Sequence, residues 1–405
     1  MRALTVLCDR VADVGGAERY WETVVPALAA RGARVDLLAR RVEQTQRFGV
    51  PAHAIAWADE HEEPSPPAAL AVAEHLRRRA PDVVVTASVF DTAVLDAVRA
   101  SGARWVVRIH DHRSFCPTGD RVFPQFEAPC TQAMGAACRA ATVLRGCVQG
   151  PRTSSFRRIA AREAVRDRIA RADLVLVSSE HMRRLCIANG IDARRVAITP
   201  PPLPDAAFAA PPAPRAADPV LLFASRLTPR KGLRSLLRAL ARVPRERRPL
   251  LVVAGTGERE EHDARADARR LDVEVAWRGH LDAPALREAI DAAWAVAVPS
   301  LWPEPFGLVG IEAQARGRPA VAYHVGGIGD WIDGAGIAVR RGDEAALAEA
   351  IAAVFEPDRW SALAGAARAR AEHHRLDTHV DRLLQLCGAN DITSSYEPTI
   401  ERSIA

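Results

Sequence analysis

The chain has 405 residues, a length that fits two domains of about 200 residues better than a single one. Aromatic residues make up only 5%, the net charge is +5 and the pI is near 9.0. Arginine supplies almost all of the positive charge, because Lys231 is the only lysine. No DNA- or RNA-binding motif accompanies the arginines, so we expect no nucleic-acid partner.

No stretch of the sequence has the length of a membrane span or the pattern of a signal peptide. The apolar run at residues 3–8 is too short for either and is followed by Asp9. Seven cysteines in such a chain are expected to be thiols or ligands rather than disulfides. We therefore expect a cytoplasmic protein, with the inner membrane surface as an alternative location.

The first half of the chain alternates short apolar runs with helical patterns, which predicts a parallel α/β sheet. The expected strands are residues 3–8, 34–38, 81–88, 104–110 and 173–178, and residues 196–199 are expected to end the first domain. Gly15 and Gly16 lie between the first strand and a helix at residues 18–31, where the backbone can approach a ligand closely. His110 closes its strand at the carboxyl edge and is expected to face the same cleft as Gly15.

The segment from 111 to 150 has no clear periodicity and carries Cys116, Cys130, Cys138 and Cys147. The four cysteines could form a zinc site, a regulatory pairing or plain thiols. The spacings contain no C-x-x-C knuckle, which favours plain thiols over zinc. A loop of this length is usually functional, and we expect ligand recognition or a lid. The arginine-rich helix at 152–171 is either a solvated face or a surface that attracts anionic lipid.

Prolines crowd residues 200–219, which we expect to link the first domain (1–199) to a second one (220–370). The second domain opens with a strand at 220–224. Arg226 and Lys231 follow it, just before a helix that begins near Gly232, so both cations are expected beside a helix N-terminus. A lysine in an arginine-rich chain fits a phosphate-binding point charge.

Two more strand and loop units follow, at 250–257 and 274–280, and the second ends in Gly279 and His280. Next come a strand at 294–298, a proline-rich loop with Glu304, and a helix at 307–316 with Glu312. The amide N–H groups of Phe306, Gly307 and Leu308 are expected to point at a phosphate. Two carboxylates beside them suit sugar hydroxyls, so the pattern suggests a nucleotide sugar.

The rest of the second domain is expected to contain a strand at 320–323, the loop with Asp330, and helices at 344–355 and 359–386. We expect residues 371–387, the end of the last helix, to return to the first domain. The tail at 388–405 turns polar and is expected to be disordered.

Glu304 and Glu312, with seven residues between them and Pro-Phe-Gly after the first, resemble the motif of the retaining glycosyltransferases of family 4 (glycosyl transferases group 1). The resemblance implies an α/β protein of the GT-B fold, in which two Rossmann-like domains face each other across a cleft. It implies an acceptor-binding first domain and a donor-binding second domain. The implied reaction moves a sugar from a nucleoside diphosphate to a hydroxyl with retention at the anomeric carbon.

The resemblance also implies residue roles. The catalytic set is His110, Arg226, Lys231 and Glu304. The donor-binding set is Gly15, Gly16, Gly279, His280, Phe306, Gly307, Leu308 and Glu312. Arg226 and Lys231 are expected to neutralise the diphosphate without a metal, since no D-x-D pair is present, and we expect no cofactor.

Two other functions stay open. A nucleotide-sugar 2-epimerase shares the architecture, and a non-catalytic nucleotide-sugar-binding protein would share the site. The acceptor, a glycan, a lipid-linked glycan or a small molecule, and the donor sugar are left undetermined.

Overall fold

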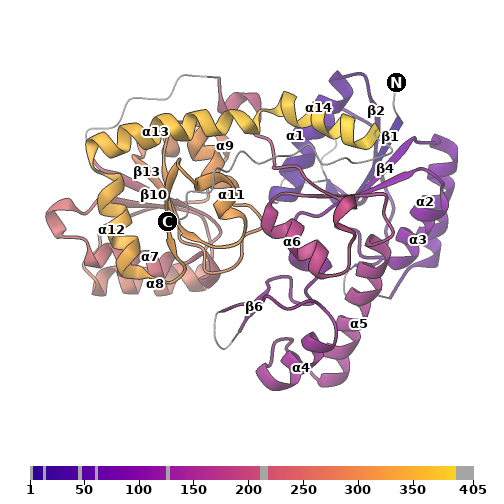
Figure 1. Ribbon diagram of the computed structural model, residues 1–405, viewed down its shortest axis with the longest axis horizontal. Coiled ribbons are helices and arrows are strands. Elements are labelled where there is room, and N and C mark those ends of the chain that lie inside the picture. Colours follow the sequence, from indigo (N-terminus) through magenta and orange to yellow (C-terminus); the bar gives the residue numbers. More distant parts are fainter. Residues whose placement is uncertain are drawn as a thin grey trace.

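The computed structural model describes residues 3–11, 15–43, 48–59, 63–124, 128–209 and 218–388. Two α/β units, one on each side in Figure 1, are joined by the chain near residue 200 and by the C-terminal helices. Of the predicted tail (388–405), Gly388 is helical and residues 389–405 lie outside the described residues, as does the middle of the predicted linker, residues 210–217.

The first unit is built on a seven-stranded parallel sheet in the order β3-β2-β1-β4-β5-β8-β9. Its strands are β1 (Ala3–Val11), β2 (Arg34–Val42), β3 (Ala52–Ala54), β4 (Val83–Ala87), β5 (Arg104–Arg108), β8 (Leu174–Val177) and β9 (Val196–Ile198). Alternate residues of β1 enter cores on opposite faces: Leu4 and Val6 lie in one core and Leu7 in the other. Short apolar strands buried on both faces are typical of parallel sheets.

Helices cover both faces of this sheet: α1 (Gly16–Ala30), α2 (Pro66–Arg79), α3 (Thr92–Ala100), α5 (Arg152–Ile169) and α6 (Glu180–Ala188). Side-chain oxygens cap the N-termini of α2, α3 and α6, at Ser65, Asp91 and Ser179. Helix α1 begins at Gly16, two residues before the predicted start.

The second unit has a six-stranded parallel sheet in the order β12-β11-β10-β13-β14-β15. Its strands are β10 (Val220–Ala224), β11 (Leu250–Ala254), β12 (Val275–Gly279), β13 (Ala295–Val298), β14 (Ala320–His324) and β15 (Gly336–Arg340). The helices are α7 (Leu233–Arg242), α8 (Glu258–Arg270), α9 (Ala283–Ala292), α10 (Leu308–Ala315), α11 (Gly329–Ile332), α12 (Glu344–Val354) and α13 (Pro357–Ala371). The strand order reverses at β10 and β13, which is where ligands bind in open sheets of this kind.

The cysteine-bearing segment contains more regular structure than predicted. It holds a short 3-10 helix (His112–Ser114), a hairpin of β6 (Val122–Phe123) and β7 (Ala128–Pro129), and helix α4 (Ala136–Arg145). Helices α4 and α5 form a projection from the first unit, at the bottom of Figure 1. We call residues 136–169 the α4–α5 projection.

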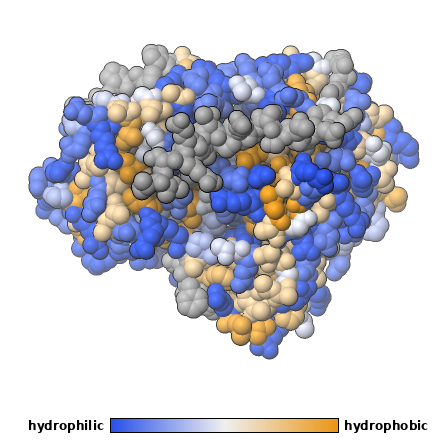
Figure 2. Space-filling view, in the orientation of Figure 1, coloured by the Kyte–Doolittle hydropathy of each residue, from blue (hydrophilic) through white to orange (hydrophobic). Residues whose placement is uncertain are grey.

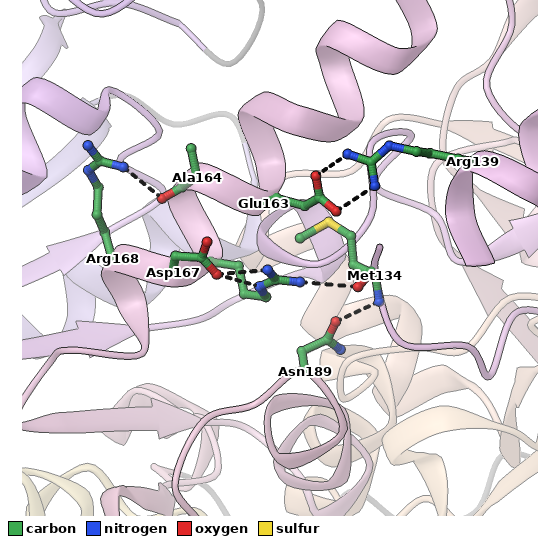
Figure 3. A network of polar contacts seen from close by, with 8 residues as sticks. Met134, Arg139, Glu163, Ala164, Asp167, Arg168 and Asn189 are labelled. Atoms are coloured by element: carbon green, nitrogen blue, oxygen red, sulfur yellow. Dashed lines mark hydrogen bonds and ion pairs between the residues drawn. The ribbon is translucent and has the colours of Figure 1, made fainter. Parts of the chain in front are cut away.

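Polar contacts fasten this projection, as Figure 3 shows. The guanidinium of Arg139 on α4 pairs with the carboxylate of Glu163 on α5. Arg166 donates to the carbonyl oxygen of Met134 (3.1 Å), and Asn189 Oδ1 accepts from the amide of Met134 (2.8 Å). The position of α4 is therefore set by contacts with α5 and with the end of α6.

The prediction of one unbroken helix at 359–386 is wrong. Helix α13 ends at Ala371, a 3-10 turn spans Glu372–His374, and α14 (Leu376–Gly388) begins after Arg375, whose ψ of 136° is extended. The amide of Leu203 donates to the carbonyl oxygen of His374 (2.8 Å), so the connection between the units occupies the break. Helix α14 packs against α1 of the first unit (Figure 1).

Candidate active site between the two sheets

Loops that follow strand ends in both sheets meet between the two units. His112 Nε2, after β5, donates to the carbonyl oxygen of Pro303, 2.6 Å away. The hydroxyls of Ser178 and Ser179, after β8, donate to the carbonyl oxygen of Pro305 at 2.9 and 2.7 Å. The loop after β13 that carries Glu304 is therefore held directly against the first unit.

Two glycines after β14 make this contact possible. Gly326 has a φ of +62°, and a Cβ there would lie 2.3 Å from the carbonyl oxygen of Glu304. A Cβ on Gly327 would lie 2.5 Å from the carbonyl oxygen of Pro305 and 2.7 Å from Ser179 Cβ. Only glycine fits such approaches, so this loop, Glu304 and the first unit form one packed junction.

Glu304 is 5% exposed, and two other side chains hold its carboxylate. Its Oε1 accepts from Lys231 Nζ and from Ser300 Oγ, both at 2.6 Å. Burial raises the pKa of Glu304, but the Lys231 charge and the hydrogen bonds from Lys231 and Ser300 outweigh it, so the pKa lies below its usual value. Glu304 is thus a buried, oriented carboxylate.

Lys231 reaches Glu304 because its loop packs tightly on the end of β13. It closes a 3-10 turn (Pro229–Lys231), and Gly232 follows with a φ of +75°. A Cβ on Gly232 would lie 1.9 Å from the carbonyl oxygen of Pro299, so a larger residue would push the loop away. The Lys231 ammonium also lies 5.3 Å from the centre of the Trp302 ring, a cation–π contact.

Arg226 lies in the same loop but is exposed, and it has no ion pair among the described residues. The backbone beside it is fixed, because the amide of Leu227 donates to the carbonyl oxygen of Thr256 (2.8 Å). A Cβ on Gly257 would lie 2.0 Å from the carbonyl oxygen of Leu227, so the loops after β10 and β11 touch. A rigid loop therefore presents a free guanidinium at the carboxyl end of β10.

Helix α10 starts beside this loop. Gly307 caps it with a φ of +97°, and its first residue is Leu308. In the described part of the chain the amides of Phe306, Gly307 and Leu308 have no hydrogen-bond acceptor. The Phe306 ring is buried, so only the backbone of that residue is available to a ligand. Free amides at a helix start favour an anion.

Glu312 lies one turn into α10, half-buried and with no hydrogen-bond partner among the described residues. Burial raises the pKa of Glu312, although the charges of Arg19 on α1 and Arg287 on α9 act in the opposite direction. A half-buried carboxylate without a hydrogen-bond partner costs stability in a folded protein, and such groups cluster at functional sites.

His110 lies two residues beyond β5, because the strand ends at Arg108 rather than at His110 as predicted. Its Nε2 is buried without a hydrogen-bond partner in the described structure. The ring packs edge-on against Tyr20 (5.0 Å between centres) and Trp21 (6.0 Å). Burial, aided by the charges of Arg108 and Arg113, lowers the pKa of His110 well below its usual value, so the imidazole is neutral.

The two glycines of the first unit approach the second unit. Gly15 is the N-cap of α1 and is extended, with a φ of −164°. A Cβ on Gly16 would lie 3.1 Å from the Leu308 side chain at the start of α10. The structure therefore brings Gly16 and Leu308 together, 292 positions apart in the chain.

Gly279 ends β12 at the same edge of the second sheet, and His280 follows it. The carbonyl oxygen of Gly279 accepts from the amide of Gly255 (2.6 Å), which ties this loop to the one after β11. His280 is exposed and has no hydrogen-bond partner among the described residues.

The four cysteines of the 111–150 segment are free thiols. Burial and the neighbouring thiols of Cys116, Cys130 and Cys138 raise the pKa of Cys147 to about 11, so these groups lie in one region. In the described part of the chain, no three of them bring their Sγ atoms within 4.8 Å of one another.

Several residues of the junction were not predicted from the sequence. Ser300, His112, Ser178 and Ser179 bond the Glu304 loop, and Asp330 Oδ2 accepts from the amide of Glu180 at the start of α6 (2.6 Å). Each lies at or just beyond the carboxyl end of a predicted strand, and Ser178 is the last residue of the predicted strand 173–178; that position was the available signal. Arg230 pairs with Asp120 across the units, a contact between two loops that no local pattern indicates.

Comparisons with known proteins match both halves of the chain. Residues 15–202 match the "Glycosyl transferase 4-like domain" and residues 207–370 match "Glycosyl transferases group 1". The curated relatives include a glycogen synthase of Mycobacterium tuberculosis, 36% identical over 48% of this chain and 44% of that protein. The aligned region thus spans less than half of that relative. A D-inositol 3-phosphate glycosyltransferase of Xylanimonas cellulosilytica is 28% identical over 92% of this chain and 91% of its own.

Solved glycosyltransferase structures have the same fold. A glycosyltransferase from Rickettsia africae superposes with a TM-score of 0.72 at 15% identity, covering 95% of this chain and 98% of that one. HepE from Anabaena, solved in complex with UDP, superposes with a TM-score of 0.71 at 19% identity over 95% and 99% of the two chains. The fold is therefore GT-B, as expected from the sequence.

Proposed function

We propose that this chain, whose two domains belong to the glycosyl transferase 4-like and glycosyl transferases group 1 families, transfers a sugar from a nucleoside diphosphate to an acceptor hydroxyl with retention at the anomeric carbon. The observation that carries the proposal is the arrangement around Glu304. A buried carboxylate, its lysine partner, a free arginine and the unpaired amides of a helix start all lie at the point where the second sheet reverses its order.

The cations and amides suit the leaving group. Departure of a diphosphate leaves negative charge on its oxygens while the anomeric carbon becomes positive. Arg226, Lys231 and the amides at Gly307 and Leu308 would bind that charge, and each well-placed donor contributes about 3 kcal/mol to transition-state stabilisation. In this proposal the cations take the part that a metal ion plays in other transferases.

The carboxylates and the histidine suit the sugar. Glu304 would accept hydrogen bonds from hydroxyls of the transferred sugar, because Lys231 and Ser300 hold one of its oxygens and leave the other to a ligand. Glu312 would accept from the ribose hydroxyls. The neutral His110 would position the sugar through its unpaired Nε2. Gly279 and His280 would line the base.

The first domain would bind the acceptor. Gly15 and Gly16 admit the donor phosphates without a side chain in the way, and the 111–150 segment lies against the second domain through the Asp120–Arg230 pair. The relatives named glycogen synthase and D-inositol 3-phosphate glycosyltransferase use carbohydrate or polyol acceptors by their names, so we propose a hydroxyl acceptor in a glycan or glycolipid.

Product analysis tests the reaction. The purified protein is incubated with a nucleoside-diphosphate sugar and a panel of sugar and inositol phosphate acceptors, and the products are followed by NMR. The proposal expects a new glycosidic bond with the donor's anomeric configuration. An inverted product would contradict retention. A free epimerised sugar without an acceptor would identify the 2-epimerase, and an unchanged donor that binds tightly would identify the non-catalytic binding protein.

We further propose that the protein works at the cytoplasmic face of a membrane. None of the helices in the described residues is long and apolar enough to cross one. All seven cysteines are free thiols, which is typical of a reducing compartment. Helix α4 exposes Ala136, Ala137, Ala140, Val143 and Leu144 on one side, with Leu144 81% exposed.

Charge complements this apolar face. Arg145 at the end of α4 and Arg152 and Arg157 on α5 are exposed on the same projection, and apolar atoms gather at the tip of the α4–α5 projection in Figure 2. An apolar helix face flanked by arginines suits an anionic lipid surface. Leu144→Asp is expected to abolish co-sedimentation with vesicles containing phosphatidylglycerol, whereas Leu70→Asp, at a leucine of α2 that is 72% exposed, is expected to leave it intact. Equal loss in both variants, or no binding by the unmodified protein, would contradict this surface.

A further inference from the structure

Three possible metal ligands converge at the outer edge of the first sheet. Asp36 is on β2, His53 on the edge strand β3 and His75 on α2. Their ligand atoms all lie within 4.8 Å of one another, the only such group of three in the part of the chain that the structure describes. Three elements that are separate in the sequence thus direct a carboxylate and two imidazoles at one point.

Two hydrogen-bond acceptors in this group share one donor, the Arg79 guanidinium. Both imidazoles present Nε2 to the same carboxylate: His75 bonds Oδ2, and His53 lies 3.2 Å from Oδ1. The guanidinium of Arg79 also lies 3.1 Å from His53 Nε2, and a nitrogen that accepts from Arg79 cannot donate to Asp36. Arg79 lies 3.4 Å from Oδ1 as well, so its charge bridges two acceptors.

We propose that Asp36, His53 and His75 bind a divalent ion of the zinc class, and that the Arg79 guanidinium takes the place of the cation when no metal is bound. Two imidazole nitrogens and one carboxylate oxygen form a common ligand set for zinc, with water in the fourth position. Ligands about 2.1 Å from a tetrahedral ion lie about 3.4 Å apart, close to the His53 to Asp36 distance of 3.2 Å.

Burial and exposure are arranged as such a site requires. Asp36 and His75 are 8% and 7% exposed and are held by β2 and α2. The His53 side chain is 42% exposed, which provides an entry path for the ion, and the Arg79 side chain is 48% exposed and can turn outward. A bound ion would displace Arg79 without moving the buried ligands.

The position of the site indicates a structural role. Asp36 is in the amino-terminal half of β2, whereas the candidate active site lies at the carboxyl ends of the strands. Strand β3 has three residues and, among the described strands, pairs with β2 alone. A metal would fasten this short edge strand to β2 and α2, independently of the proposed transfer reaction.

Zinc titration of the chelator-treated full chain tests the proposal by calorimetry and by the thermal midpoint. We expect one equivalent of Zn²⁺ to bind and to raise the midpoint. His53→Ala should weaken that binding at least tenfold, because it removes a ligand that is half exposed and contributes little to the core. His262→Ala, at an exposed histidine of α8, is the matched control and should change nothing. Cys130→Ser should also leave the binding intact, which separates the site from the thiols.

The Arg79→Ala variant distinguishes a metal site from a plain network of hydrogen bonds more clearly than His53→Ala does. Removing the competing cation should tighten Zn²⁺ binding, by about tenfold, if the three side chains are metal ligands. A plain network of hydrogen bonds predicts instead that Arg79→Ala lowers the midpoint and leaves zinc binding unchanged. That outcome, or unaltered zinc binding in His53→Ala, would overturn the proposal.

Discussion

The pairing of Lys231 with Glu304 determines what single substitutions do to this site. Two charges are removed from bulk water, with side chains 21% and 6% exposed, and each needs the other. Removing one partner of a buried pair leaves an uncompensated charge, whereas replacing both can be nearly neutral. The same pair therefore contributes to stability and to the orientation of Glu304.

We expect Lys231→Met to lower the free energy of unfolding by about 3 kcal/mol, because Glu304 loses its counter-charge. The double variant Lys231→Met with Glu304→Gln should recover most of that loss, since no buried charge then remains. Urea unfolding of the two single variants and the double variant measures the coupling. Additive losses would show that the two side chains do not act as a pair.

For Glu312 we expect the opposite effect, because removing its charge should stabilise the fold. The pKa of Glu312 in the folded state is raised above its value in the unfolded state, so folding disfavours the ionised carboxylate. The resulting loss of folding free energy is fully present at neutral pH, where Glu312 is ionised in the unfolded state. The cost disappears as the pH falls below the unfolded pKa, because both states are then protonated. Glu312→Gln should therefore raise the thermal midpoint at pH 7 and leave it unchanged near pH 3.5. A lower midpoint at pH 7 would show that Glu312 stabilises the fold.

At the scale of elements, α14 contributes to the core of a domain to which it is not adjacent in the sequence. Val380, Leu383, Leu386 and Cys387 are buried against α1. The hydroxyl of Tyr20 lies 2.9 Å from His379 Nε2, which adds a buried hydrogen bond. The first domain is therefore incomplete without the last helix.

Leu383→Ala should accordingly destabilise the first domain by about 2 to 5 kcal/mol, the usual cost of a cavity at a buried leucine. Leu384→Ala removes the same atoms from a half-buried neighbour and should cost less. Hydrogen exchange of β1 and β2 reports on this domain specifically. Equal protection of these strands in the two variants would contradict the role of α14.

The sequence predicted most strands and the residues at their carboxyl ends, because apolar runs and the glycines and charged residues after them are local signals. It missed α4, whose pattern Ala-Ala-Cys-Arg-Ala-Ala-Thr-Val-Leu-Arg leaves its apolar face outside the core. It also missed the break at Arg375, since no proline or glycine marks it and the reason is a contact with Leu203.

The sequence indicated candidate site residues at strand ends, but it could not indicate how their side chains are arranged. The bond from Lys231 to Glu304 joins positions 73 apart, and the bond from His112 to Pro303 joins positions 191 apart. Such contacts depend on how the two sheets face each other. The paired state of Glu304 and the unpaired state of Glu312 could therefore be learned only from the structure.

At the scale of the whole molecule, the junction between the units depends on close backbone approach. Gly327→Ala would place a Cβ 2.5 Å from the carbonyl oxygen of Pro305 and should separate the units, increasing the radius of gyration measured by small-angle X-ray scattering. Gly365→Ala is the matched control, because a Cβ there meets nothing within 4 Å. An unchanged radius in Gly327→Ala would contradict a junction held at this loop.

In the proposed reaction, a nucleoside-diphosphate sugar binds between Arg226, Glu312 and the start of α10. We would measure this binding by calorimetric titration with UDP-, GDP-, ADP- and dTDP-sugars. The titrations compare the unmodified protein with Arg226→Gln and Glu312→Gln. The control is Arg259→Gln, at an exposed arginine of α8. We predict that one nucleotide class binds and that the first two substitutions each weaken binding at least tenfold, about 1.4 kcal/mol. The control should bind as the unmodified protein does. Absence of binding for every nucleotide sugar, or equal affinities in all four proteins, would contradict the account.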